Sequence, residues 1–187
     1  MGFGNTILLI IVAVGAYLVV IYNKFVSLRA GMDASWSDID VQLKRRYDLI
    51  PALVDTVRGY KDYEANTLEK VIQARQQGLS AGTMDEKAAA ANVLSGALGK
   101  LFALAEAYPD LKANTNFLHL QGELSGLEDA IQNARRYYNA IVRDYNAKTE
   151  SFPDLFVAQK FNFTARDYFE LDESEAEAAK KMPKIDL

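Results

Sequence analysis

The feature that most constrains this chain is a run of apolar residues between Phe117 and Tyr145, which recur in steps of three and four without interruption. Such steps follow one face of an α-helix, and a seam sustained over four heptads must be covered by neighbouring helices. The sequence therefore predicts a long helix, ended by Ser151-Phe152-Pro153, inside an all-α bundle. The seam residues are Phe117, Leu120, Leu124, Leu127, Ile131, Ala134, Tyr138, Ile141 and Tyr145.

An earlier stretch has the same periodicity and contains a proline near its end. Its apolar residues are Met32, Trp36, Ile39, Leu43, Tyr47, Ile50, Val54 and Val57, with polar residues on the other face. Pro51 lacks a backbone donor and disfavours helix at the residue before it, so we expect a kink or a short break there. Between Asn23 and Trp36 only Gly31 interrupts the helical pattern, so we expect the N-terminal segment to continue into this helix.

Two further helices complete the expected bundle. The pattern resumes through Leu68, Val71 and Ile72 to about Gln77, and Thr83 with Glu86 three residues on predicts a capping box for a helix from Met84 to Tyr108. Long helices with short connections predict an up-and-down antiparallel bundle of three or four helices. After Pro153 we expect an irregular aromatic segment packed on the bundle, and from Asp172 a charged mobile tail.

The N-terminus carries a candidate membrane anchor. No charged side chain occurs from Gly2 to Asn23, and Ile7–Ile21 is almost wholly aliphatic. About 20 apolar residues span the hydrocarbon core of a bilayer as a helix. Tyr22 follows where an interfacial tyrosine is expected. We therefore predict a transmembrane anchor over residues 1–26, a bundle over 27–170 and a tail over 171–187.

A cleaved signal peptide is the alternative reading of the anchor. Ala13-Val14-Gly15 resembles a cleavage site, but a positive region before the apolar run is missing and apolar residues continue past it. The flanks also predict orientation, because Lys24 and Arg29 follow the segment and no basic residue precedes it. The positive-inside bias predicts a single-pass protein of the cell membrane with its short N-terminus outside and its bundle in the cytoplasm.

Composition removes several functional classes. The net charge of −4 disfavours nucleic acid as a partner, because duplex binding depends on Lys and Arg. The absence of cysteine removes disulfides, thiol catalysis and thiolate metal sites, and a single histidine, His119, excludes multi-histidine zinc sites and di-metal bundle sites. His119 is offset from the seam, with Glu123 four residues on, so we expect a surface position. We predict no catalytic, cofactor-binding or metal-binding residue and no enzymatic activity.

Two basic clusters are candidates for contact with a partner. By helical phase Tyr138 belongs inside, which leaves Tyr137 with Arg135 and Arg136 for the surface, the composition of a binding hot spot. Lys44, Arg45 and Arg46 form the second cluster. A lipid-binding patch is one interpretation of it, but the cluster lies about 30 Å of helix beyond Lys24. Contact with a protein partner, or ion pairing with Asp40 and Asp48, is the interpretation that we favour.

Several motifs resemble the LemA family of bacterial membrane proteins. They are WSDIDVQLKRRYDLIPALV at Trp36–Val54, LFALAEAYPDLKANTN at Leu101–Asn116, the Tyr-Asn pairs at 138–139 and 145–146, Ser-Phe-Pro at 151–153, and Phe163 with Tyr168-Phe169-Glu170. Ala52, where an asparagine is expected, and residues 59–64 depart from the pattern. The resemblance implies a transmembrane helix with a tiny exterior N-terminus, a cytoplasmic bundle and no enzymatic activity. It implies an envelope-associated protein, and family members are often encoded near membrane proteases or TPM-domain proteins.

Two non-enzymatic functions therefore compete, beside a third class, an enzyme with an unusual carboxylate-only or metal-dependent site. The first is a membrane-anchored, non-catalytic scaffold or interaction protein of the bacterial envelope. Its partners would be the lipid bilayer through the N-terminal helix, and other membrane proteins or copies of itself as a homo-oligomer. The alternative is a membrane-remodelling or envelope-stress protein that acts on lipid, which the acidic net charge disfavours.

Overall fold

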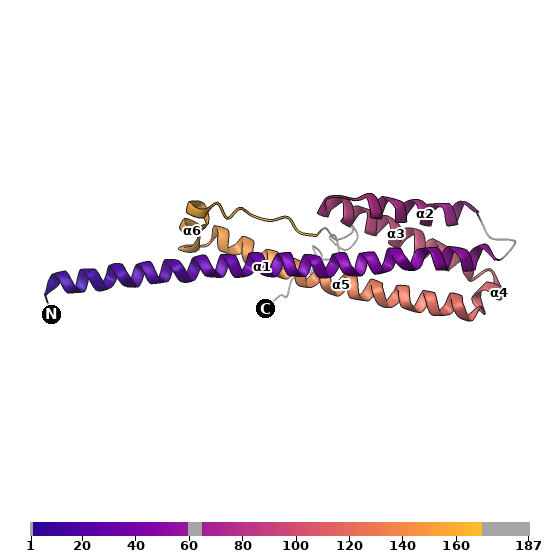
Figure 1. Ribbon diagram of the computed structural model, residues 1–187, viewed down its shortest axis with the longest axis horizontal. Helices are drawn as coiled ribbons and strands as arrows, with labels where there is room; N and C mark the ends of the chain where they lie inside the picture. The colour runs from indigo at the N-terminus through magenta and orange to yellow at the C-terminus, as the bar shows by residue number, and fades with distance from the viewer. Residues whose placement is uncertain (1, 60–64, 170–187) are drawn as a thin grey trace, which may run out of the picture. The chain divides into compact units, whose positions relative to one another are not determined.

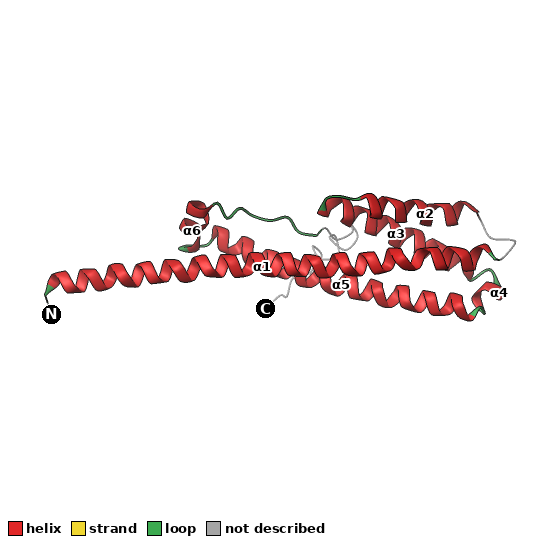
Figure 2. Ribbon diagram, viewed as in Figure 1, coloured by secondary structure: helices red, strands yellow, loops and turns green. Residues whose placement is uncertain are grey.

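The computed structural model describes residues 2–59 and 65–169, and within these ranges it consists of helices joined by short loops, with no strand (Figure 2). The all-α prediction is therefore confirmed. The expected mobile tail over 171–187 lies outside the described residues. The described helices are α1 (Phe3–Arg58), α2 (Ala65–Ser80), α3 (Met84–Ala105), α4 (Pro109–Lys112), α5 (Thr115–Glu150) and α6 (Asp154–Phe161).

Helix α1 runs through both Gly31 and Pro51. The expected continuation of the anchor into the first bundle helix is confirmed. Of the kink or short break expected at Pro51, the break does not occur. Proline cannot donate to the carbonyl four residues earlier, which belongs to Tyr47. Arg75 of α2 donates its Nε–H to that carbonyl at 2.8 Å. The carbonyl therefore has a partner from another helix, which lowers the cost of proline inside α1.

The other helix ends follow local sequence signals. Thr83 caps α3, and the predicted capping box with Glu86 is present in both directions. Hydrogen bonds from the Thr83 and Gly82 amides lower the pKa of Glu86 below its ordinary value. Helix α3 ends at Ala105 rather than Tyr108, and Pro109 occupies the first turn of α4, where its missing N–H costs nothing.

The chain forms two compact units. Of the described residues, one unit comprises 2–38 with Ala134–Tyr168, and the other comprises 39–59, 65–133 and Phe169. The second unit contains the bundle core, in which the last part of α1, then α2, α3 and the first part of α5, run in alternating directions (Figure 1). The predicted up-and-down arrangement has four helices there. Gly78 on α2 allows the closest approach, because a Cβ at this position would lie 2.4 Å from the Tyr47 ring on α1.

In the first unit, an aromatic cluster joins α1 to the last part of α5 and to α6. Phe25 stacks on Phe163 at 4.7 Å between centroids and meets Tyr145 edge-on at 5.7 Å. Asn146 of α5 exchanges two hydrogen bonds with the backbone of Arg166, at 2.8 and 2.9 Å. The segment after Pro153 is therefore held to α5. The expectation of an irregular segment is wrong for residues 154–161, which form α6, and several of its aromatic side chains are exposed.

The predicted seam of α5 is confirmed, and the burial of its side chains alternates regularly along the helix. Every seventh residue is fully buried, namely Phe117, Leu124, Ile131, Tyr138 and Tyr145, and the intervening seam residues are half-buried. One heptad position thus faces the centre of its unit, as knobs-into-holes packing requires.

Two described helices are long and apolar enough to cross a membrane by length and composition. Residues 2–20 of α1 are exposed throughout, although most of their side chains are aliphatic. Helix α3, by contrast, buries eight residues in the bundle, which explains its apolar character. The N-terminal segment of α1 therefore has the properties expected of a membrane anchor.

Candidate functional site

A buried arginine lies at the centre of the candidate site. Arg46 of α1 is seven residues from both Ile39 and Leu53, so the heptad repeat that buries these side chains also buries Arg46, which is only 2 % exposed. A buried guanidinium is costly unless it is paired and hydrogen-bonded. The position therefore requires partners from the other helices.

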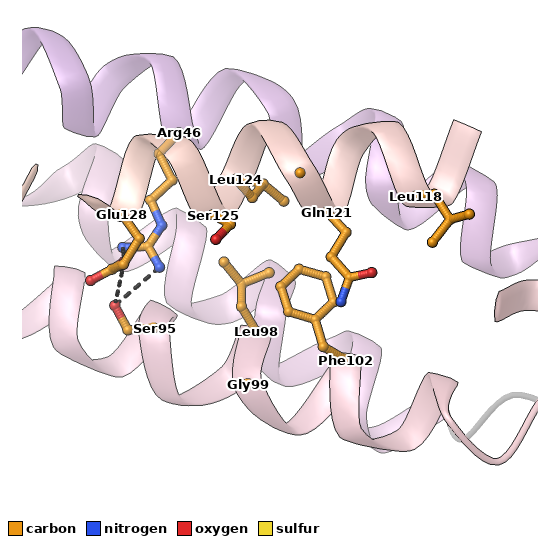
Figure 3. A pocket seen from close by; sticks show the side chains of 11 residues that line it. Arg46, Ser95, Leu98, Gly99, Phe102, Leu118, Gln121, Leu124, Ser125 and Glu128 are labelled. Carbon is orange, nitrogen blue, oxygen red and sulfur yellow. Dashed lines mark hydrogen bonds and ion pairs between the residues drawn. The ribbon is translucent and has the colours of Figure 1, made fainter. Parts of the chain in front are cut away.

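Two other helices supply those partners. Arg46 Nη1 lies 2.8 Å from Glu128 Oε2 on α5, and Arg46 Nη2 donates to Ser95 Oγ on α3 at 3.0 Å. The Ser95 hydroxyl lies 3.2 Å from Glu128 Oε2 and can donate to it. Gln132 donates to the other carboxylate oxygen of Glu128 at 3.4 Å. This polar cluster of Arg46, Ser95 and Glu128 connects α1, α3 and α5 within one unit (Figure 3).

The electrostatics of the cluster favour a structural ion pair. Burial lowers the pKa of Arg46, and the nearby charge of Glu128 partly offsets this effect. Arginine remains charged at neutral pH even so, because a guanidinium ordinarily loses its proton only in strongly alkaline solution. The charges of Arg46 and Glu128 cancel locally. The cluster therefore presents no net charge to a partner.

A groove of about 620 Å³ extends from this cluster between α3 and α5. Leu98 and Phe102 of α3 lie on one side, with Gln121 and Leu118 of α5 farther along (Figure 3). Leu118 is exposed although it is aliphatic. Apart from the polar cluster, Gln121 and Ser125, the described lining is apolar or glycine. Such a groove fits an apolar surface better than it fits a charged ligand.

Glycines leave the edges of this groove without side chains. Gly99 on α3 and Gly122 on α5 line it, and Gly126 lies one turn beyond Gly122. A Cβ built at any of these three positions meets nothing within 4 Å. Glycine inside a helix costs roughly 0.5–1 kcal/mol relative to alanine. The packing among the described residues therefore does not explain why these positions lack a side chain.

A second groove, of about 500 Å³, lies beside Gly126. Its lining combines the opposite charges of Arg45 and Asp48 from α1 with Glu123 from α5, and two leucines. Gly122 and Gly126 thus mark a strip of α5 with a groove on either side. We call this strip, with its two grooves, the glycine face.

Comparison with known proteins decides the family. The family model described as the LemA family matches residues 35–186. The chain belongs to the LemA family. The resemblance carried by the motifs at Trp36–Val54 and Leu101–Asn116 is therefore confirmed. The family is not known as a family of enzymes.

Individual relatives agree with this assignment. The chain is 35 % identical to Protein LemA of Metamycoplasma hominis over 137 residues, which cover 71 % of this chain and 61 % of the relative. It is 25 % identical to Magnetosome protein MamQ 2 of Paramagnetospirillum magneticum, over 86 % of this chain and 68 % of that protein. Magnetosome protein MamQ of Magnetospirillum gryphiswaldense is 24 % identical, over 79 % and 64 %. The chain therefore spans about two thirds of the length of these relatives. Family membership and the apolar N-terminal helix support a membrane-associated protein.

The six candidate surface residues of this LemA chain divide into two groups. Lys44, Arg45 and Arg136 are exposed, and Tyr137 is 64 % exposed. Arg46 and Arg135 are buried, so they are not part of a surface that a partner can contact. Helical phase alone did not distinguish them, because long arginine side chains can occupy core positions when other helices supply partners.

The expected ion pairs of the Lys44–Arg46 cluster are also corrected. Arg46 pairs with Glu128, and Asp40 pairs with Lys87 of α3. His119 is exposed as expected, and its Nδ1 lies 3.8 Å from Glu123. Among the described residues, no three His, Cys, Asp or Glu side chains gather in a way that could hold a metal ion.

Sequence reasoning missed the residues that build the glycine face. Glu128 and Ser95 are separated from Arg46 by 82 and 49 positions, and nothing in the sequence connects them. The glycines had a usable signal, because Gly122 and Gly126 are four apart inside the strongest helical pattern of the chain. Glycines at this spacing in a helix are a known device for close helix approach.

Proposed function

We propose that this LemA chain is a membrane-anchored, non-catalytic scaffold of the bacterial envelope that associates with further copies of itself through the glycine face. The observation that carries the proposal is that Gly99, Gly122 and Gly126 face open space in helix interiors, beside an apolar groove. Glycine inside a helix lowers the stability of the fold. Where the internal packing does not need it, it is expected at a place where another surface approaches the helix closely.

A second copy fits the chemistry of this face. The groove between α3 and α5 is largely apolar apart from its internally neutral ion pair, so an uncharged helix surface is complementary to it, whereas the groove beside Gly126 carries charges of both signs. The glycine face is itself such a surface, with exposed Leu118 available to enter the groove of a neighbour. Two-fold assembly uses the same patch on both subunits, which makes a self-complementary patch sufficient. Anchoring in one membrane also raises the effective concentration of copies.

The proposal includes the topology that the flanking charges favour. One membrane pass by α1 leaves a short N-terminus outside and the bundle in the cytoplasm. The scaffold would then present its glycine face to other copies beneath the membrane, and exposed residues such as Arg136 and Tyr137 would be available to membrane protein partners.

Crosslinking of the full-length protein in native membranes tests self-association. We expect the unmodified chain to give a defined oligomer and Gly122→Leu to lose most of it, because a leucine there fills the space that a neighbour would occupy. Ala89→Leu is the matched control, since Ala89 is exposed on α3 and lines neither groove of the glycine face. Gly122→Ala should raise the free energy of unfolding by about 0.5–1 kcal/mol and weaken the oligomer.

Three results would contradict the proposal. One is that only monomer is captured at the expression level of the native protein. Another is that Gly122→Leu and Ala89→Leu reduce crosslinking equally, which would point to a general effect of bulk. Capture of a different membrane protein in place of a second copy, lost in Gly122→Leu, would retain the scaffold but replace its partner.

A further inference from the structure

The point at which protein begins to cover α1 is sharply defined. Every side chain from Gly2 to Val20 is exposed, whereas Ile21 and Phe25 are buried by the rest of the first unit. The helical part of this stretch, Phe3–Val20, has eighteen residues and is about 27 Å long, close to the thickness of the hydrocarbon core. The level of Ile21 therefore marks one boundary of the lipid-covered part of α1.

Helix α6 is fixed at this boundary. Its last residue, Phe161, meets Tyr22 of α1 edge-on, with ring centroids 4.8 Å apart. Phe163, just beyond α6, lies 5.6 Å from Tyr22 and stacks on Phe25. Tyr22 is two residues after Val20, which is a rise of about 3 Å along the helix. The contact thus places the end of α6 within a few ångströms of where lipid should end.

Local structure holds α6 in this position. Val157 and Ala158 are buried, so one side of the short helix is packed against the unit. Asn162 ends the helix in the left-handed conformation with φ of 55°, and the amide of Phe163 donates to the Ala158 carbonyl at 2.9 Å. The turn directs the chain back toward Phe25.

Aromatic rings are exposed before α6 and at two points along it. Phe152 precedes the helix, Phe156 lies away from the buried pair, and Phe161 ends the helix on the same side as Val157. Phe152, Phe156 and Phe161 are 80 %, 61 % and 53 % exposed, and the first two meet edge-on at 5.7 Å. We call these three residues the α6 aromatic face. Phenylalanines packed together in water bring no compensating polar contact, since their rings lack a polar atom. Adjacent exposed aromatics therefore indicate a surface that is covered by something else.

Charges around this face suit the surface of a membrane. Asp154, the acidic residue of α6, is paired with Lys148 at 3.2 Å. Lys160 precedes Phe161 in α6 and is exposed, Lys24 is exposed two residues after Tyr22 on α1, and Glu150 is an exposed acidic residue before Phe152. Aromatic rings with flanking lysines are characteristic of segments that lie in the interface plane of a bilayer.

We propose that the α6 aromatic face lies in the lipid headgroup region, so that α6 is a second membrane contact in addition to the anchor. Lipid is the occupant because the face adjoins the lipid-covered part of α1 through the contact between Phe161 and Tyr22. The proposal concerns a surface in the first unit and goes beyond self-association through the glycine face.

Nitroxide labelling of single cysteines tests this contact, and the sequence has no cysteine to remove first. Full-length Phe152→Cys and Phe156→Cys proteins would be labelled and reconstituted in phosphatidylcholine and phosphatidylglycerol vesicles. Collision rates with oxygen and with a water-soluble nickel chelate report depth. Tyr137→Cys, an equally exposed aromatic position on α5, is the aqueous control, and Val12→Cys is the deep reference.

We expect both α6 labels to show an oxygen-to-nickel collision ratio several-fold above that of Tyr137→Cys and below that of Val12→Cys. A ratio equal to that of Tyr137→Cys would overturn the proposal, because the face would then lie in water. Protection from both reagents that increases with the protein-to-lipid ratio would also overturn it, since protein would cover the face. All four positions are exposed, so the substitutions leave the core unchanged.

Discussion

Arg46 is a charged residue in a position where the heptad repeat requires a core side chain. Its long aliphatic stem fills space in the core, and its guanidinium reaches Ser95 and Glu128. A buried ion pair of this kind contributes little net stability, but the loss of one partner is costly because the other charge stays buried. The cluster also fixes which heptad of α1 faces α3 and α5, as polar core residues do in coiled coils.

Replacement of Glu128 tests this interpretation at the scale of single residues. Glu128→Leu should lower the free energy of unfolding by about 2–3 kcal/mol, because Arg46 would keep only the Ser95 hydroxyl. The double variant Arg46→Met with Glu128→Leu should lie within about 1 kcal/mol of the unmodified protein, since no charge then remains buried. Urea unfolding of the full chain in detergent, followed by circular dichroism, measures both values. Additive losses in the double variant would show that the two residues act independently.

At the scale of elements, Pro51 and Arg75 form a pair that spans two helices. The proline frees the Tyr47 carbonyl, and Arg75 of α2 donates to it. The bond therefore anchors α2 to α1 at a carbonyl to which Pro51 cannot donate. A charge-assisted hydrogen bond to a carbonyl is stronger than the neutral bond that it replaces.

A double-mutant cycle measures this pair. Arg75→Met should cost about 1.5–3 kcal/mol, because the Tyr47 carbonyl then has no donor. In a Pro51→Ala background the same change should cost distinctly less, since the amide of the new alanine donates to Tyr47 within α1. The four unfolding free energies give the coupling energy. A cost of Arg75→Met that is equal in both backgrounds would mean that the proline is tolerated for another reason.

The helices themselves could be predicted because their signals are local. The seam from Phe117 to Tyr145 and the capping box of Thr83 and Glu86 depend on residues within a few turns of each other. Continuity of α1 through Pro51 could not be predicted in the same way, because the donor is 24 residues away in sequence. Helix α6 was missed since only eight residues form it, and its position depends on contacts with Tyr22 and Phe25 of α1.

The candidate site was predictable only where exposure follows from helical phase. That reasoning placed Tyr137 and Arg136 outside and Tyr138 inside, as the structure has them. It failed for Arg46 and Arg135, because the burial of an arginine depends on groups that tertiary packing brings to it. The grooves beside Gly122 need the positions of α1, α3 and α5 together, which periodicity does not give.

At the scale of the whole molecule, the proposed topology rests on very few charges. Lys24 and Arg29 are the basic residues nearest the end of the apolar run, and none precedes it. We expect a cysteine at Gly2 to react with a membrane-impermeant maleimide in spheroplasts, in which the cell membrane is intact and exposed to the reagent. A cysteine at Tyr137, which is exposed, should react only after the membrane is permeabilised. The reverse pattern would place the bundle outside.

The contact between Tyr22 and Phe161 affects how the anchor helix can adapt to bilayers of different thickness. An ordinary anchor helix adjusts to a thicker or thinner membrane by sliding or tilting, at a modest cost per ångström. With α6 seated in the headgroups, one end of the lipid-covered part of α1 is held at a set height, and the mismatch falls on the opposite end, around Phe3. Membranes of unequal thickness would then differ in how readily they accommodate this protein, and the length from Phe3 to Val20 would set its preference among them.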